Sequence, residues 1–149
     1  MSFDVKVRER ILKPVSEVFN AFVDPVQMSN YFISGASGPI EPGAHVIWEF
    51  ADVGAKVAID VLEVRKDSAI LYESSALGQL LRTTITFEGD GPNATVVTVI
   101  DSSFELNEEG VERALGQNAG WTYTLCGLKD YLQFGIHLRA GLNKRLTDV

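Results

Sequence analysis

Apolar and charged residues alternate along the first eleven positions of the chain. One face of this segment carries apolar side chains, namely those of Phe3, Val5, Val7 and Ile11. A period of two is typical of a strand that buries one face, so a strand is predicted over Phe3–Ile11. Glu9 is the exception, because the same alternation places its carboxylate on the apolar face.

Two short helices are predicted after this strand. Pro14 ends the strand, and the stretch "PVSEVFNAFVD" has apolar residues at helical spacing, namely Val18, Phe19, Phe22 and Val23. Asp24 and Pro25 interrupt that helix, and the following "VQMSNYF" is interpreted as a second one.

The middle of the chain has the pattern of a β-sheet. After the glycine-rich stretch "SGASGPIEPG", short apolar runs are separated by turn signals such as "EGDGPN". The candidate strands are Ala44–Ala51, Lys56–Arg65, Ser68–Ser74, Leu80–Phe87 and Thr95–Phe104. The order of strand, two helices, antiparallel strands and a final helix predicts an α+β fold, in one domain over residues 1–149.

The final helix is apolar around much of its circumference. At about 100° per residue, one stripe contains Trp121, Leu125, Leu128, Leu132 and Ile136. A second stripe contains Tyr123, Tyr131, Phe134 and Leu138. This pattern predicts a helix that is buried over more than half of its surface, as a helix held by a strongly curved sheet would be. The glycines Gly116, Gly120 and Gly127 are expected to let another backbone approach it closely. Asn107 is placed to cap its beginning.

Composition and charge narrow the possible functions. The chain has 149 residues, of which 46% are hydrophobic, and no run of 18 apolar residues. We therefore expect a globular protein without a transmembrane helix, and the first twenty residues lack the apolar core of a signal peptide. A cytoplasmic location is the default expectation. The net charge of −7 argues against nucleic acid and anionic membranes as partners. Lys144 and Arg145 are interpreted as offsetting the dipole at the end of the last helix.

Few residues suggest metal or nucleophile chemistry. Cys126 is the only cysteine, which excludes an internal disulfide and a cysteine-based zinc cluster. His45 and His137 are far apart in the sequence and are interpreted as surface residues. No phosphate-binding or dinucleotide fingerprint is present, so neither a metal nor a cofactor is predicted.

Three stretches resemble a known family. "GWTYTLCGLKDYLQFG" resembles the closing pattern of one branch of the START-like, or SRPBCC, superfamily. This branch is named after the C-terminal domain of the activator of the heat-shock-protein-90 ATPase. "KPVSEVFNAFVDPVQMSNYF" and "EPGAHVIWEF" resemble the branch's earlier motifs. The resemblance implies a helix-grip fold, in which a curved antiparallel sheet wraps around a long C-terminal helix and two short helices follow the first strand.

The resemblance also implies a cavity between the sheet and the last helix, which in relatives often binds small, mostly apolar molecules. The expected wall residues are aromatic or aliphatic, namely Phe22, Met28, Phe32, Trp48, Phe50, Tyr72, Trp121, Leu125 and Leu128. Each of these could equally be an ordinary core residue. Glu9, Glu63 and Arg82 could meet as a polar end of the cavity. A bulge or a strand end could instead turn each of them outward.

Three classes of function remain open on this basis. The leading hypothesis is binding of a small hydrophobic molecule, oriented by Glu9, Glu63 or Arg82. The second is a cavity enzyme of the polyketide-cyclase type, with Glu9 or Glu63 as the base. The third is a protein-interaction or co-chaperone-like module, or a homodimer formed through Ile47 and Leu71 on the outer face of the sheet.

Overall fold

The computed structural model of the chain describes residues 1–75 and 78–141. Its elements, in chain order, are β1 (Ser2–Ile11), α1 (Val15–Val23), α2 (Pro25–Met28), β2 (Gly35–Ala36), β3 (His45–Phe50), β4 (Ala55–Arg65), β5 (Ala69–Ser74), β6 (Leu81–Gly89), β7 (Thr95–Glu105), α3 (Glu108–Phe134) and the short 3₁₀ helix η2 (Leu138–Gly141).

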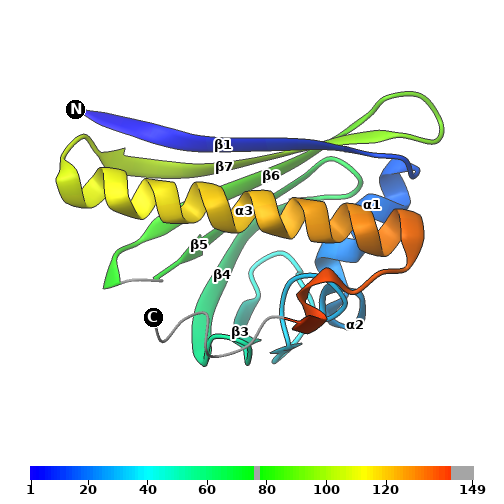
Figure 1. The fold of residues 1–149 in the computed structure, drawn as a ribbon, viewed down its shortest axis with the longest axis horizontal. Helices are drawn as coiled ribbons and strands as arrows, with labels where there is room; N and C mark the ends of the chain where they lie inside the picture. Colours follow the sequence, from blue (N-terminus) through cyan, green and yellow to red (C-terminus); the bar gives the residue numbers. More distant parts are fainter. Residues whose placement is uncertain (76–77, 142–149) are drawn as a thin grey trace.

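The strands form one antiparallel sheet with the order β1-β7-β6-β5-β4-β3-β2. The long helix α3 lies across one face of this sheet, alongside β1 and β7, and α1 and α2 lie near its C-terminal end (Figure 1). The predicted α+β helix-grip architecture is confirmed. The predicted strands all occur within a few residues of their expected bounds. Among the described strands, the two-residue β2 was not predicted, and the second helix is shorter than predicted, since α2 ends at Met28.

Two bulges interrupt the regular alternation of the sheet. Between β4 and β5 the register shifts between Val61 and Glu63, so that an extra residue enters β4. Between β1 and β7, Phe3 pairs with Phe104 but Val5 pairs with Asp101, so two residues of β7 lie opposite one residue of β1. A bulge bends its strand and redirects the side chains beyond it. Both bulges determine which side chains face α3.

The core lies between the concave face of the sheet and the helices, and Tyr31 is at its centre. Tyr31 is fully buried and donates a hydrogen bond from its hydroxyl to the carbonyl oxygen of Ala21 at 2.7 Å. Its ring packs against Phe22 and Tyr131. A Cβ on Gly127 of α3 would lie 3.3 Å from the Tyr31 carbonyl oxygen. The expected close approach of another backbone is therefore present at Gly127.

Helix α3 has a defined beginning and end. The side chain of Asn107 accepts a hydrogen bond from the Gly110 amide at 2.8 Å, which satisfies one of the free N–H groups of the first turn. The helix ends before Gly135, which has a φ of 67° that favours glycine. The predicted apolar stripes extend through Ile136 and Leu138. That extension is wrong, and Ile136 is 51% exposed.

The burial of α3 is also narrower than predicted. Its buried residues, including Trp121, Thr124, Leu125 and Leu128, fall on one face that covers less than half of the circumference. A Cβ added at Gly116 or at Gly120 would meet no atom within 4 Å, so no other backbone approaches these two glycines. Lys144 and Arg145 lie outside the described residues. No helix in the described part of the chain is both long and apolar enough to cross a membrane.

Candidate functional site

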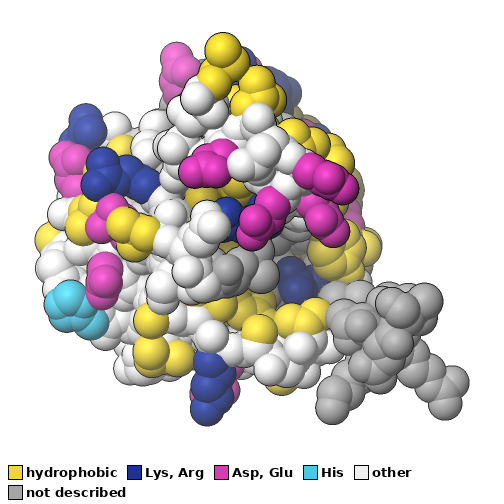
Figure 2. All heavy atoms as spheres, turned by 90° about the vertical axis from the view of Figure 1, so that its left-hand side faces the viewer, with side chains coloured by type: hydrophobic (Ala, Val, Ile, Leu, Met, Phe, Trp, Pro, Cys, Tyr) yellow, Lys and Arg dark blue, Asp and Glu magenta, His cyan; other side chains and the backbone are white. Residues whose placement is uncertain are grey.

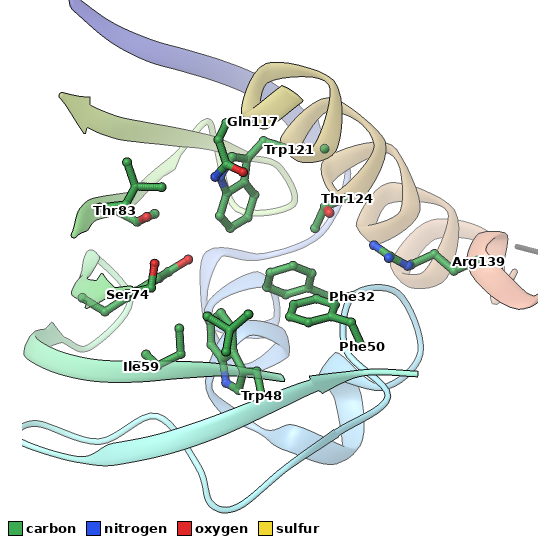
Figure 3. Close-up of a pocket in the computed structure, with 14 residues that line it drawn as sticks. Phe32, Trp48, Phe50, Ile59, Ser74, Thr83, Gln117, Trp121, Thr124 and Arg139 are labelled. Atoms are coloured by element: carbon green, nitrogen blue, oxygen red, sulfur yellow. The ribbon is translucent and has the colours of Figure 1, made fainter. Parts of the chain in front are cut away.

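A cavity of about 250 Å³ lies between the concave face of the sheet and α3 (Figure 3). Five aromatic side chains form much of its wall: Phe32, Trp48, Phe50, Tyr72 and Trp121. The rest of the lining is aliphatic or polar, namely Val57, Ile59, Leu81, Ser74, Thr83, Gln117, Gly120, Thr124 and Arg139. Strands β3 to β6 supply one side of the cavity, and α3 supplies the other.

Phe32 links the aromatic side chains on the two sides. It follows α2, and its ring centre lies 5.2 Å from that of Trp48 on β3 and 5.3 Å from that of Trp121 on α3. The ring of Phe50 meets it edge-on at 5.5 Å. Tilted and edge-to-face arrangements are favourable for aromatic rings. Both tryptophans of the chain therefore lie on the cavity wall.

A buried carboxylate lies behind this wall. Asp101 of β7 is fully buried and accepts hydrogen bonds from three residues that line the cavity. The donors are Thr83 Oγ1 at 2.6 Å, Gln117 Nε2 at 2.9 Å and Trp121 Nε1 at 2.9 Å. The sheet register explains the first contact, because Thr83 of β6 pairs directly with Asp101. Asp101 thus orients side chains from both sides of the cavity without lining it.

Burial changes the acidity of this cluster. Removal from water raises the pKa of the Asp101 carboxyl, and the three hydrogen bonds lower it only in part. Burial also raises the pKa of the Tyr72 hydroxyl, and the nearby Asp101 raises it further, while a hydrogen bond with Thr83 acts in the opposite direction. Tyr72 therefore stays protonated at physiological pH. The side chains of β5, β6 and β7 form a polar row of Tyr72, Thr83 and Asp101 across the sheet.

Arg139 of η2 forms one end of the cavity. Its guanidinium pairs with the carboxylate of Asp52, at 2.7 Å from Nη2 and 3.1 Å from Nε. It also lies over the ring of Tyr123, 5.5 Å from the ring centre. A second pocket of about 110 Å³ shares Phe32 and Arg139 with the main cavity. The Arg139–Asp52 pair thus lies where the two spaces meet.

The structure places the predicted site residues in three groups. Phe32, Trp48, Phe50, Tyr72 and Trp121 line the cavity. Four others are buried in the core but are absent from the lining, namely Phe22, Met28, Leu125 and Leu128. The three charged residues, Glu9, Glu63 and Arg82, lie elsewhere. The predicted polar end composed of these three charges does not form.

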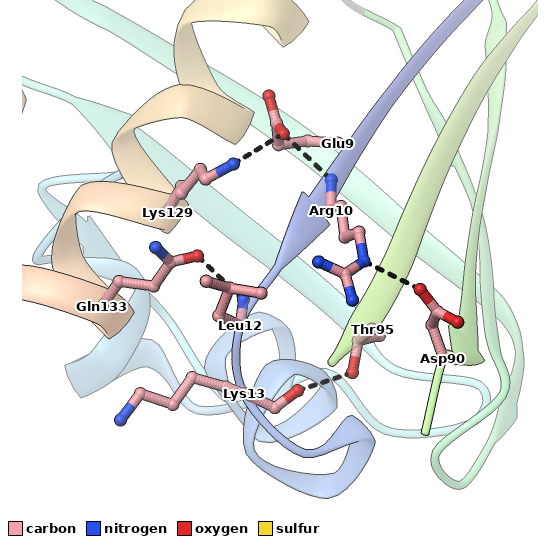
Figure 4. A network of polar contacts seen from close by, with 8 residues as sticks. All are labelled: Glu9, Arg10, Leu12, Lys13, Asp90, Thr95, Lys129 and Gln133. Carbon is pink, nitrogen blue, oxygen red and sulfur yellow. Dashed lines mark hydrogen bonds and ion pairs between the residues drawn. The ribbon is translucent and has the colours of Figure 1, made fainter. Parts of the chain in front are cut away.

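Glu9 faces the helix, as the strand alternation predicted, but it does not reach the cavity. Its Oε1 lies 3.1 Å from Nζ of Lys129 on α3 and accepts a hydrogen bond from the Arg10 amide (Figure 4). Nearby, Gln133 of α3 accepts a hydrogen bond from the Leu12 amide at 2.8 Å. These contacts attach the last turns of α3 to the end of β1. Glu9 therefore connects β1 to α3.

Glu63 and Arg82 lie on the outer face of the sheet, so the expectation that they face the cavity is wrong. The bulge in β4 places Glu63 outward instead of continuing the inward row of Ile59 and Val61, and Glu63 pairs with Arg65. Arg82 follows the regular alternation of β6 and pairs with Glu73 at 3.0 Å. Each of these two residues is therefore paired with an oppositely charged neighbour on the outer face of the sheet.

The polar residues that matter most in the cavity wall and behind it were not among the predicted site residues. Asp101 shares the inward face of β7 with Val97 and Val99, which is the same signal that identified Glu9 on β1. Gln117 and Thr124 lie on the face of α3 that carries Trp121. Arg139 gave no such signal, because it lies beyond the end of the helix.

The distribution of acidic side chains on the surface agrees with the negative net charge of the chain. Acidic side chains gather on the face of the molecule at which α3 begins (Figure 2), where Glu108 and Glu109 occupy the first turn of the helix. Carboxylates there interact favourably with the helix dipole.

His45 and His137 are exposed, as predicted, and Cys126 is exposed too. Within residues 1–75 and 78–141, no three His, Cys, Asp or Glu side chains form a metal-binding group.

Comparison with known proteins identifies the family. The family model for "Activator of Hsp90 ATPase homolog 1-like protein" matches residues 13–133, which is most of the chain. The chain belongs to this family. The resemblance inferred from the sequence motifs is thereby confirmed. No curated protein matches the chain.

Solved structures of similar proteins agree with this assignment. The chain is 30% identical to protein SSP2350 from Staphylococcus saprophyticus, with a TM-score of 0.82 over 94% of this chain and 98% of that one. It is 29% identical to DynU16, a protein of the dynemicin biosynthetic locus, with a TM-score of 0.79 over 90% of this chain and 48% of that one. The Aha1 dimer from Colwellia psychrerythraea shares the fold at 17% identity, with a TM-score of 0.74 over 89% and 97% of the two chains.

Proposed function

We propose that the chain binds a small, mostly apolar molecule in the cavity between the sheet and α3. The observation that carries this proposal is the cavity itself, with about 250 Å³ of space, five aromatic side chains and a few polar groups at defined places. Pockets for small molecules have this composition, since the apolar wall supplies affinity and the polar groups set the orientation. The similarity to DynU16, a protein of a biosynthetic locus, is compatible with a small-molecule ligand.

Naphthalene is a suitable first probe, because it is apolar and has no hydrogen-bonding group. We expect the purified protein to bind it with one site per chain in equilibrium dialysis. Native mass spectrometry of protein from its own host would show in parallel whether a small molecule is carried along. If naphthalene does not bind and no molecule co-purifies, the proposal is wrong.

Two glycines of α3 provide a matched pair of variants. Gly120 lines the cavity, whereas Gly116 lies one helical turn earlier and does not, and a Cβ at either meets no atom within 4 Å. Gly120→Leu and Gly116→Leu should both stabilise the helix, by somewhat less than about 1 kcal/mol. Only Gly120→Leu should weaken naphthalene binding. Equal affinities in the two variants would place the probe outside the cavity.

The two alternative functions receive less support. A cavity enzyme of the polyketide-cyclase type needed Glu9 or Glu63 as its base, and neither residue lines the cavity. A homodimer would use the outer face of the sheet, where Ile47 is 41% exposed and Leu71 is half-buried. Light scattering at high protein concentration tests this alternative, and a monomer mass would count against it.

A further inference from the structure

Three side chains on the cavity wall direct their hydrogen-bond donors at a carboxylate behind the wall. Thr83 has one hydroxyl hydrogen, and it faces Asp101 Oδ1 at 2.6 Å. Trp121 has one N–H group, and it faces Asp101 Oδ2 at 2.9 Å. Gln117 directs its NH₂ group at the same oxygen, also at 2.9 Å. An ionised carboxylate can only accept hydrogen bonds, so it fixes all three donors in this direction.

The groups that Thr83, Gln117 and Trp121 leave to the cavity are therefore acceptors. Gln117 reaches down from α3 toward the cavity (Figure 3), and its amide oxygen is on the opposite branch from the nitrogen that faces Asp101. Thr83 retains the lone pairs of its hydroxyl oxygen, one of which faces the Tyr72 hydroxyl, and Trp121 offers only its ring. Thr83, Gln117 and Trp121 together form an acceptor wall.

We propose that the acceptor wall recognises a hydrogen-bond donor, so that the preferred ligand is a neutral aromatic molecule with a hydroxyl or N–H group on one edge, such as a phenol. This inference rests on the proposed function and names the ligand class for the same cavity. A ketone or ether oxygen placed at the acceptor wall would face only the lone pairs of other acceptors, so it would receive no hydrogen bond there. An anionic group would in addition be repelled by the buried Asp101.

Other polar groups of the lining do not carry this preference. Ser74, Thr124 and Tyr72 have hydroxyls that can rotate, so they can donate or accept. Arg139 is a donor, two of its five N–H groups are directed at Asp52, and it lies at a different part of the wall from Gln117 (Figure 3). The preference for a donor thus depends on the side chains that bond to Asp101. Substitutions at the acceptor wall can therefore change this preference without changing the rest of the lining.

Three naphthalene derivatives test the inference by equilibrium dialysis near neutral pH. Naphthalene measures the apolar cavity, 2-naphthol adds a donor, and 2-methoxynaphthalene keeps the oxygen without the hydrogen. We expect 2-naphthol to bind about tenfold more tightly than 2-methoxynaphthalene, since one buried hydrogen bond distinguishes them. If both oxygenated probes bind equally while naphthalene binds, the ligand class is wrong and the proposed function stands. If none of the three binds, both are wrong.

Variants locate the preference on the acceptor wall. Gln117→Met keeps the length of the side chain but removes its oxygen, and the preference for 2-naphthol should fall by about threefold or more. Thr124→Val is the matched control, because it removes a lining hydroxyl that does not bond to Asp101, and it should leave the preference unchanged. An unchanged ratio in Gln117→Met, or an equal loss in the control, would overturn the assignment to this wall.

Asp101→Asn gives a second test through a residue that does not line the cavity. The N–H of Trp121 cannot be turned around, so the new amide oxygen must stay opposite Trp121 and Gln117. Its NH₂ group then faces Thr83 Oγ1, and the hydroxyl hydrogen of Thr83 is released toward the cavity. The preference for 2-naphthol over 2-methoxynaphthalene should therefore shrink, with naphthalene binding unchanged. A preserved preference would contradict the proposed role of Asp101.

Discussion

Asp101→Asn should change how the stability of the fold depends on pH. In the wild type, burial raises the pKa of Asp101 above its ordinary value of 3.8, with three hydrogen bonds opposing the shift. From pH 3.8 upward, the unfolded chain releases this proton while the folded chain still holds it. The folded state then binds more protons than the unfolded state, so the free energy of unfolding falls as pH rises.

The size of the effect follows from linkage. The contribution of Asp101 is fully present below its ordinary pKa and is lost as pH rises through its raised folded value. Each unit by which the pKa is raised corresponds to about 1.4 kcal/mol of stability lost across that window. The substituted amide does not titrate. All other ionisable groups are shared by the two proteins, so their titration cancels in the difference to first order.

Urea unfolding of both proteins at a series of pH values measures this difference. The stability of the wild type minus that of Asp101→Asn should decrease as pH rises from 3.8, and then become constant. A difference that increases with pH would mean that the hydrogen bonds from Thr83, Gln117 and Trp121 outweigh burial. A constant difference would mean that burial and hydrogen bonding balance. Either result would refute the reasoning applied to this carboxylate.

Two further substitutions test the packing that positions α3. In Gly110→Ala, the new Cβ would lie 1.9 Å from the carbonyl oxygen of Glu105, so the corner between β7 and α3 must shift. Urea unfolding should show a loss of about 1–3 kcal/mol or more, whereas Gly116→Ala, in open space, should gain about 0.5–1 kcal/mol. In Tyr31→Phe, the carbonyl of Ala21 loses its 2.7 Å partner. The expected loss is about 1–3 kcal/mol, and no loss would show that water replaces the hydroxyl.

The fold was predictable because its signals are local. The alternation of apolar and polar residues identified the strands, and the turn residues between them marked where each strand ends. The cavity was implied by the resemblance to the family, and the patterns then placed Trp48 and Phe50 on one strand face and Trp121 on the apolar stripe of the last helix. The close packing of Gly127 against Tyr31 also agrees with the expectation from the glycines of that helix.

The charged part of the site was not predictable in the same way. Glu63 was placed inward because alternation was extended across a bulge that the residue pattern does not reveal. Arg139 was missed because the helical pattern was continued past Gly135, where the chain leaves the helix and returns to the cavity as η2. Asp101 did carry a signal, an acidic residue on an apolar strand face. Its significance depends on the donors that the fold brings to it.

The bulge in β4 also has a consequence for how family members are aligned. Leu62 and Glu63 both lie on the outer side of the sheet, between the inward residues Val61 and Val64. Removing one of the two would restore regular alternation and leave the inward residues in place. A family member with one residue fewer here can therefore keep the same cavity, and a one-residue gap inside this strand would mark a true structural equivalence. Elsewhere in β4 the same gap would exchange the two faces of the strand.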